Sequence, residues 1–224
     1  MIPPGPLTRS DLERLPRTSM GKPSAFKPAV WRVETPQGPL VVKDVRHSGW
    51  ATRWIARWLL GRERRVLERL APLAGVPHLE GVIDADAIAL TLLPGRTLTA
   101  ELFKQDPREL VTQLFALTDQ LHALGVFHLD LHQRRNLLVD EDGQLHLVDF
   151  GAAIAPGRLV RALLGRLLRH VDRQAAYKFL ARFCPEELTD DEARAVLRQR
   201  SLRRLWPLSR PSRREEQAAR RRLD

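Results

Sequence analysis

Residues 128–151, HLDLHQRRNLLVDEDGQLHLVDFG, contain the pattern that decides the fold of this chain. Asp130 and Asn136 lie in the first part of the stretch, and Asp149 begins an Asp-Phe-Gly triplet at its end. Between them, two apolar runs flank a Glu-Asp-Gly turn signal, which predicts a β-hairpin. The stretch therefore places acidic and amide side chains on both sides of a predicted hairpin.

Two further hairpins are expected upstream. Residues 29–33 and 40–45 flank a Pro-Gln-Gly turn signal, which places Lys43 in the second strand of the first hairpin. Residues 82–83 and 88–92 predict the second hairpin across an Asp-Ala-Asp turn. Together they predict a small antiparallel sheet in the first part of the chain.

Helices are expected around and after this sheet. A short opening helix has capping-box spacing from Ser10 to Glu13, and a second helix covers residues 48–70 with an interruption at Gly61. Residues 110–124 and 158–183 predict the main helices downstream. In the last of these, one apolar face is formed by Leu163, Leu164, Leu167, Leu168 and Val171.

The pattern of residues 128–136, followed by Asp149-Phe150-Gly151, resembles the catalytic loop and metal-binding motif of the protein-kinase-like superfamily. His132, two residues after Asp130, looks nearest to the bacterial lipopolysaccharide kinases and RIO-like small kinases. The resemblance implies a two-lobed α+β fold, in which a small antiparallel-sheet N-lobe with one helix pair precedes a reduced helical C-lobe. We expect the N-lobe at 1–93, the C-lobe at 94–185 and a basic helical extension at 186–224.

The resemblance also implies roles for single residues, with ATP and Mg²⁺ as cofactors. Asp130 would be the catalytic base, and Asn136 and Asp149 would hold Mg²⁺. Lys43 would hold the ATP phosphates, positioned by Glu63, which follows it by 20 residues. Glu68 is a competing partner for this lysine.

The nucleotide would also contact the hinge and a covering loop. The hinge resembles Thr91-Leu92-Leu93-Pro94-Gly95, where backbone groups around Thr91 and Leu93 would hold the adenine. No Gly-rich GxGxxG pattern occurs, so the covering loop is expected at residues 21–27.

Two departures from the family pattern bear on activity. The gap from Asp130 to Asn136 is six residues, one more than usual, so that Gln133, Arg134 and Arg135 stand where two residues are expected. If the extra residue forms a bulge that keeps Asp130 and Asn136 in place, we expect an active kinase. If it misplaces Asp130, we expect a nucleotide-binding pseudokinase. After Gly151 a short segment replaces the long activation loop on which protein kinases dock peptides, which favours a non-peptide hydroxyl acceptor.

The charge of the chain points to an anionic partner. The formal net charge is +10, and a solvated basic surface is the alternative explanation. Trp50, Trp54 and Trp58 share one helix face among arginines, so the face either lies on a membrane or packs against the sheet. The arginine-rich end, residues 198–222 with Trp206, either adds attraction to anionic lipid or is a solvated tail.

These features predict an ATP- and Mg²⁺-dependent kinase acting on a hydroxyl of a membrane glycolipid, such as the sugar core of lipopolysaccharide. Arg134 and Arg135 would contact its acidic groups. The alternatives are an atypical serine/threonine protein kinase and a pseudokinase, and a nucleic-acid partner is disfavoured because it leaves the catalytic pattern unexplained. The single cysteine, Cys184, and the absence of a signal-peptide pattern predict a cytoplasmic protein, with peripheral association at the inner face of the membrane.

Overall fold

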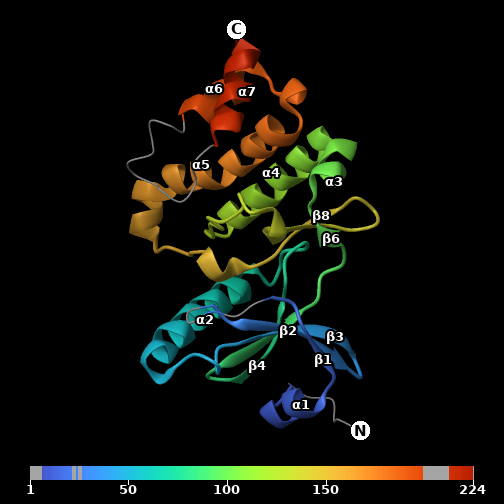
Figure 1. Cartoon of the computed structure of the whole chain (residues 1–224). Helices are drawn as coiled ribbons and strands as arrows, with labels where there is room; N and C mark the ends of the chain where they lie inside the picture. Colours follow the sequence, from blue (N-terminus) through green and yellow to red (C-terminus); the bar gives the residue numbers. More distant parts are fainter. Residues whose placement is uncertain (1–6, 22–23, 25–26, 199–211, 224) are drawn as a thin grey trace. The chain divides into compact units, whose positions relative to one another are not determined.

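A computed structural model of the chain describes residues 7–21, 24, 27–198 and 212–223. Two compact units divide after Leu93: Met1–Leu93 with Asp149–Gly151, and Pro94–Val148 with Ala152–Asp224. The fold is α+β, as predicted, with a five-stranded antiparallel sheet in the first unit and mainly helices in the second (Figure 1). The separate boundary expected at residue 185 stays a prediction.

The sheet of the first unit confirms both predicted upstream hairpins. Its order is β1-β2-β3-β5-β4, with all neighbouring strands antiparallel. The strands are β1 (Arg17–Ser19), β2 (Ala29–Thr35), β3 (Gly38–Asp44), β4 (Leu79–Asp84) and β5 (Ala87–Thr91). Gly38 has a φ of 121°, a backbone conformation that favours glycine and closes the β2–β3 turn. The edge strand β1 was not predicted, because its three residues are all exposed and lack an apolar pattern.

One long helix, α2 (Trp50–Leu70), contacts β4 and β5. Its buried face includes Ala56, Leu60 and Val66, which recur at helical spacing. The helix continues through Gly61, so the predicted interruption is wrong. A single glycine costs only about 1 kcal/mol in a helix, and the buried apolar residues on either side outweigh it.

The short helix α1 (Arg9–Arg14) packs on the sheet through Leu12, which is fully buried with Val33 and Val42. Its capping box joins Thr8 and Asp11, so the predicted box from Ser10 to Glu13 is wrong. Both pairs have the same spacing, and only the backbone geometry distinguishes them.

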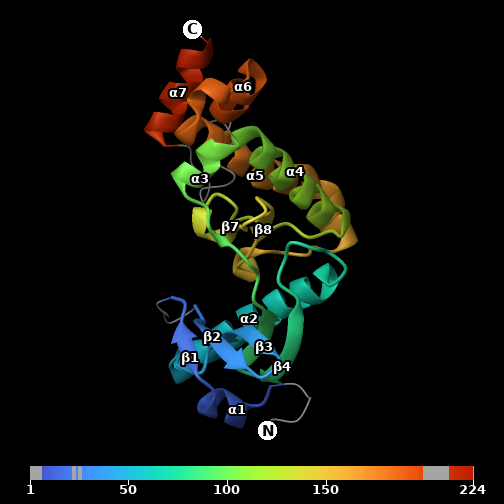
Figure 2. The ribbon, with the colours of Figure 1, turned by 90° about the vertical axis from the view of Figure 1, so that its right-hand side faces the viewer.

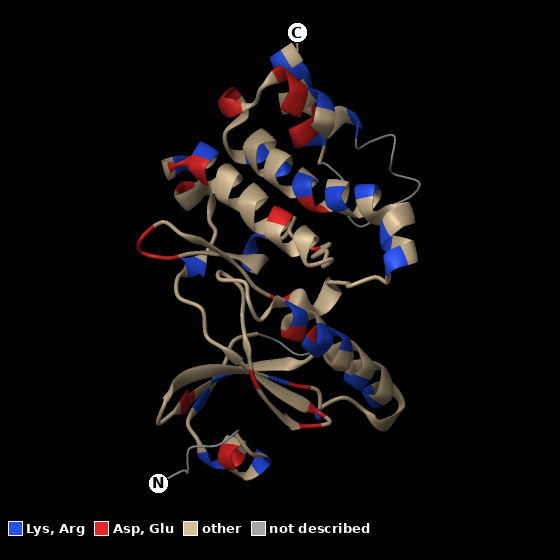
Figure 3. Cartoon of the chain, turned by 180° about the vertical axis from the view of Figure 1, so that it is seen from behind, with Lys and Arg blue, Asp and Glu red and all other residues tan. Residues whose placement is uncertain are grey.

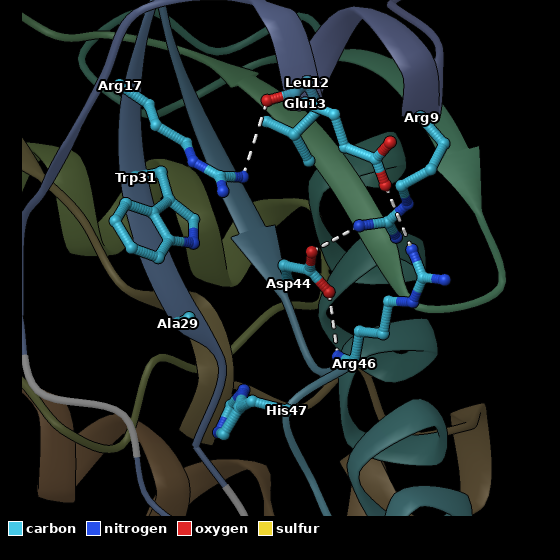
Figure 4. A pocket seen from close by; sticks show the side chains of 9 residues that line it. All are labelled: Arg9, Leu12, Glu13, Arg17, Ala29, Trp31, Asp44, Arg46 and His47. Atoms are coloured by element: carbon cyan, nitrogen blue, oxygen red, sulfur yellow. Dashed lines mark hydrogen bonds and ion pairs between the residues drawn. The ribbon is translucent and has the colours of Figure 1, made fainter.

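A pocket of about 320 Å³ lies beside α1 (Figure 4). Arg9 pairs there with Asp44, and its Nε lies 2.7 Å from Asp84. The Arg17 guanidinium lies over the Trp31 ring, 4.9 Å from its centroid. The ion pairs of Arg9 therefore hold α1 against the strands.

The second unit is built around two long helices, α4 (Pro107–Ala123) and α5 (Arg158–Phe183), which contact each other (Figure 2). Its other elements are β6 (Arg96–Thr97), α3 (Ala100–Gln105), a 3₁₀ turn (Arg134–Asn136), β7 (Leu137–Val139), β8 (Leu145–Leu147), a 3₁₀ turn (Pro185–Glu187), α6 (Asp190–Arg198) and α7 (Arg213–Leu223). The predicted hairpin of residues 128–151 is confirmed as β7–β8, to which β6 adds a third strand.

The predicted apolar face of α5 is only partly buried. Leu168 and Val171 are buried, whereas Leu163 is 73% exposed and Leu164 is 47% exposed. The predicted apolar face is therefore exposed at the N-terminal end of the helix and buried further along it. No helix among the described residues has the length and apolarity needed to span a bilayer.

Candidate functional site

Lys43 is the last residue but one of β3, an inner strand between β2 and β5. Its side chain is buried, and its Nζ donates to Glu63 Oε1 at 2.6 Å and to Asp149 Oδ1 at 2.9 Å. Burial acts to lower the pKa of Lys43, but the charges of Glu63 and Asp149 outweigh it, so the pKa is raised above its ordinary value. The lysine is therefore held as a cation between two carboxylates.

Of the two candidate glutamates on α2, the structure brings Glu63 to the lysine. Glu63 is only 3% exposed. Glu68, by contrast, is exposed, and its Oε1 lies 3.4 Å from Arg64 Nε, one turn back on the same helix. Five residues separate the two glutamates, which places them on different faces of the helix.

Asp149 has a φ of 63°, a left-handed conformation that is rare for residues other than glycine. Such a backbone costs about 1–3 kcal/mol and recurs at functional sites. Its side chain remains 49% exposed beyond the bond to Lys43. A Cβ on Gly151 would lie 3.3 Å from Asp149 Oδ1, so the glycine keeps this side of the carboxylate open.

The second unit carries the other predicted group. Asn136 is fully buried, and its Nδ2 donates to Asp130 O at 2.9 Å and to Asp130 Oδ2 at 3.0 Å. These bonds fix the orientation of the amide. Its Oδ1 is buried and has no hydrogen-bond partner among the described residues. A hard oxygen acceptor left without a donor is suited to a hard cation such as Mg²⁺, so the chemistry of Asn136 fits the predicted ligand role. That Asn136 and Asp149 share one ion stays a prediction.

The extra loop residue is absorbed locally, in a 3₁₀ turn. The N–H of Gln133 donates to Asp130 O at 3.3 Å, and the N–H of Asn136 donates to Gln133 O at 2.9 Å. The loop thus closes over six residues and still brings the Asn136 side chain to Asp130. Arg134 and Arg135 are exposed, and the Arg134 guanidinium lies over the Phe183 ring.

Asp130 itself is surrounded by donors. Gln133 Nε2 lies 2.9 Å from both Asp130 Oδ1 and Oδ2, and His132 Nδ1 lies 3.3 Å from Oδ1. Burial lowers the pKa of His132, and the negative charge of Asp130 only partly offsets this effect. Both oxygens of the predicted base are therefore engaged by the loop that contains the extra residue.

Sequence reasoning missed Asp172, the fully buried carboxylate of α5. Its two oxygens accept from the backbone N–H groups of His128 at 3.0 Å and Leu129 at 2.7 Å. The Nε2 of His122 on α4 lies 2.9 Å from Asp172 Oδ2. Leu129 has a φ of 65°, so the carboxylate holds a strained loop just before Asp130. The available signal was an acidic residue beside Val171 on an otherwise apolar helix face.

Lys178 was missed as well. It is 5% exposed on α5, and burial lowers its pKa to about 8, while the charge of Glu215 on α7 acts in the opposite direction. The positive charge of Lys178 also acts to lower the pKa of His132, which places this lysine within electrostatic reach of the catalytic loop.

The predicted hinge residues lie at the end of β5. The N–H of Thr91 donates to His78 O at 3.0 Å, and its hydroxyl accepts from His78 N at 2.9 Å, so this N–H is engaged within the sheet. Adenine contacts at Leu93 stay a prediction. The covering loop expected at residues 21–27 lies partly outside the described residues.

Comparison with known proteins supports the kinase resemblance. Residues 87–178 match the ABC1 atypical kinase-like domain. The chain is 30% identical over 146 residues to the serine/threonine-protein kinase PknH of Mycobacterium tuberculosis, which covers 62% of the chain and 22% of that protein. It is 33% identical over 78 residues to the mouse hormonally up-regulated neu tumor-associated kinase, with coverage of 32% and 11%.

These matches concern only part of each relative, since the chain spans 22% and 11% of the two proteins. The nearer resemblance to lipopolysaccharide and RIO-like kinases therefore stays a prediction. The matched residues 87–178 include Asp130, Asn136, Asp149 and the anchoring Asp172, while Lys43 and Glu63 stand upstream in the sheet and helix that a kinase-like N-lobe requires. This sequence match and the two-unit α+β fold make the chain similar to proteins with an ABC1 atypical kinase-like domain, within the protein-kinase-like superfamily.

Proposed function

We propose that the chain is an ATP- and Mg²⁺-dependent phosphotransferase with a hydroxyl acceptor. The observation that carries the proposal is the buried Lys43 ammonium between Glu63 and Asp149. Removing a lysine and a glutamate from water costs several kcal/mol per ion, which a stable fold does not require. An arrangement of this kind is accounted for by a need to present a fixed cation to phosphate oxygens.

Each residue has one task in this proposal. Lys43 binds phosphate oxygens, Asp149 and Asn136 supply oxygen ligands to the metal, and Asp130 orients the acceptor hydroxyl and takes its proton. Mg²⁺ held there would neutralise charge on the phosphate oxygens. The oxygen of the acceptor then forms a bond to the terminal phosphorus of ATP, as the bond from that phosphorus to ADP breaks.

For the acceptor, we propose a sugar hydroxyl of an anionic membrane glycolipid. Only residues 152–157 connect Gly151 to the start of α5 at Arg158, which leaves little chain for docking a peptide. Arg134 and Arg135 are exposed beside Asp130 in the sequence, where guanidinium groups match carboxylate or phosphate. The pseudokinase is the second candidate, because Gln133 occupies both oxygens of Asp130.

Calorimetry of ATP binding tests the nucleotide part of the proposal. In the wild type, Mg²⁺ should strengthen ATP binding, and Asp149→Ala should weaken binding in Mg²⁺ by about tenfold or more, because the metal loses its charged ligand. The matched control, Asp142→Ala in the exposed β7–β8 turn, should bind as the wild type does. Equal Mg²⁺-dependent affinity in Asp149→Ala and the wild type would show that the assignment is wrong.

Gln133→Ala tests whether the loop restrains the base. Gln133 competes with an acceptor hydroxyl for Asp130, and the net contribution of a hydrogen bond is about 1 kcal/mol. We therefore expect the variant to raise kcat/KM for the acceptor about fivefold, with the KM for ATP unchanged. Steady-state kinetics would measure the effect. A fall in kcat/KM would instead make Gln133 a group that positions Asp130 for catalysis.

A further inference from the structure

Three tryptophans project from α2 into solvent. Trp50 is 90% exposed, Trp54 is 68% exposed and Trp58 is 57% exposed. They follow one another at every fourth residue, so they form a continuous ridge over two helical turns. The interpretation that this stripe packs against the sheet is wrong, because Ala56, Leu60 and other residues of the opposite face fill that contact.

Basic residues surround the ridge. Arg65 and Arg69, both exposed, continue the outer side of α2 towards its C-terminus. The Arg62 guanidinium lies over the Trp58 ring, 5.5 Å from its centroid. Figure 3 shows Lys and Arg along this helix. The ridge is thus both aromatic and cationic. We call this surface the tryptophan face, and it consists of Trp50, Trp54, Trp58, Arg65 and Arg69.

A second surface of the same chemistry occurs in the other unit. At the N-terminal end of α5, Leu159 and Leu163 are each 73% exposed, while Val160 and Leu164 are 45% and 47% exposed. Exposed arginines accompany them on the same helix, namely Arg158, Arg166 and Arg169. An apolar ridge with flanking arginines therefore arises independently on two helices.

We propose that the tryptophan face docks on the surface of an anionic lipid bilayer, and that the α5 surface, by the same chemistry, binds such a bilayer in its own right. Indole side chains favour the boundary between headgroups and acyl chains, where their rings are apolar and the N–H can still be hydrogen-bonded. Flanking arginines then face anionic headgroups, each worth about 1 kcal/mol near the surface. The inference concerns binding alone and does not require phosphoryl transfer.

The net positive charge of the chain favours an anionic bilayer over a second copy of the chain as the partner of the tryptophan face. A partner of the same sequence would bring another net charge of +10, and the same arginines, against the ridge. Anionic lipid brings the opposite charge instead. A convex helix ridge also suits a deformable surface that closes around it, as interfacial helices do.

Vesicle sedimentation tests the proposal. The wild type should bind vesicles of phosphatidylglycerol mixed with phosphatidylcholine, and binding should fall at high salt, because screening weakens the arginine contribution. Replacing Trp50, Trp54 and Trp58 by Ser should weaken the partition about 100-fold. Arg65→Gln with Arg69→Gln, which keeps the tryptophans, should weaken binding to anionic vesicles about 30-fold. Leu159→Ser with Leu163→Ser should give a smaller loss than the tryptophan triple variant.

Controls separate docking from folding. Met20→Ser, which alters an exposed apolar residue elsewhere in the first unit, should bind as the wild type does. Thermal unfolding of the tryptophan variant should match that of the wild type. Equal vesicle binding by wild type and triple variant would overturn the proposal. The proposal would also be overturned if the wild type formed a dimer in analytical ultracentrifugation, and the tryptophan replacements abolished the dimer while vesicle binding persisted. Tight binding of single-stranded RNA that the replacements abolish, again with vesicle binding unchanged, would have the same meaning. ATP affinity is measured separately, so failure here leaves the proposed function standing.

Discussion

Asp130→Ala is expected to reduce phosphoryl transfer about 1,000-fold, because a positioned general base contributes rate of this order. Its ATP-Mg²⁺ affinity should stay within about twofold of the wild type, since Asp130 is assigned to the acceptor and not to the nucleotide. Single-turnover assays with labelled ATP would measure the rate, and calorimetry would measure binding.

The matched control for this prediction is Asp142→Ala, which removes an exposed aspartate from the turn of the β7–β8 hairpin. It should leave both rate and affinity unchanged. Turnover that survives in Asp130→Ala would contradict the role of Asp130 as base. Wild-type protein that binds ATP-Mg²⁺ but transfers no phosphate to any lipid, sugar or protein fraction would support the pseudokinase.

Asp172→Ala is expected to lower the free energy of unfolding by about 4 kcal/mol, because it removes a buried charged acceptor that receives two backbone hydrogen bonds. The backbone N–H groups of His128 and Leu129 would be left buried without their acceptor, beside His122. Urea unfolding followed by circular dichroism would measure the change. The loop that carries Asp130 would lose its attachment to α5. Phosphoryl transfer should therefore fall even at urea concentrations below the midpoint of unfolding.

Asp119→Ala serves as the control for Asp172. Asp119 on α4 lies 3.6 Å from Arg173 on α5, the next residue after Asp172, but its side chain is 56% exposed. Exposed ion pairs contribute little, so its removal should change stability by less than about 0.5 kcal/mol. A similar loss in the two variants would mean that Asp172 acts only as a helix–helix contact.

Local patterns predicted the fold because the relevant signals are short in sequence. The β2–β3 hairpin follows from a Pro-Gln-Gly turn between apolar runs. The metal-ligand roles that the resemblance implies for Asn136 and Asp149 stay a prediction. Lys43 stood out because lysines are rare in this chain, and the family resemblance favoured Glu63 over Glu68 as its partner, which is the glutamate that the structure brings to it.

Other features depend on contacts that spacing does not encode. Whether the Trp50 stripe is core or surface depends on which face of α2 meets the sheet, and periodicity alone allowed either. The choice between Thr8 and Ser10 as N-cap depends on backbone angles. The engagement of Asp130 by Gln133 depends on how a longer loop folds back, which no residue pattern specifies.

The bond between Asp172 and the catalytic loop has a consequence for how such chains diverge. Asp172 accepts hydrogen bonds from backbone N–H groups, so substitutions at positions 128 and 129 leave these bonds in place. The condition is that the residue at position 129 can adopt the left-handed φ. The anchor itself lies 43 residues further along the chain from Leu129, and an apolar side chain there would leave the backbone N–H groups of the loop without their acceptor. Motif searches confined to the loop therefore pass over the residue that keeps the loop in shape.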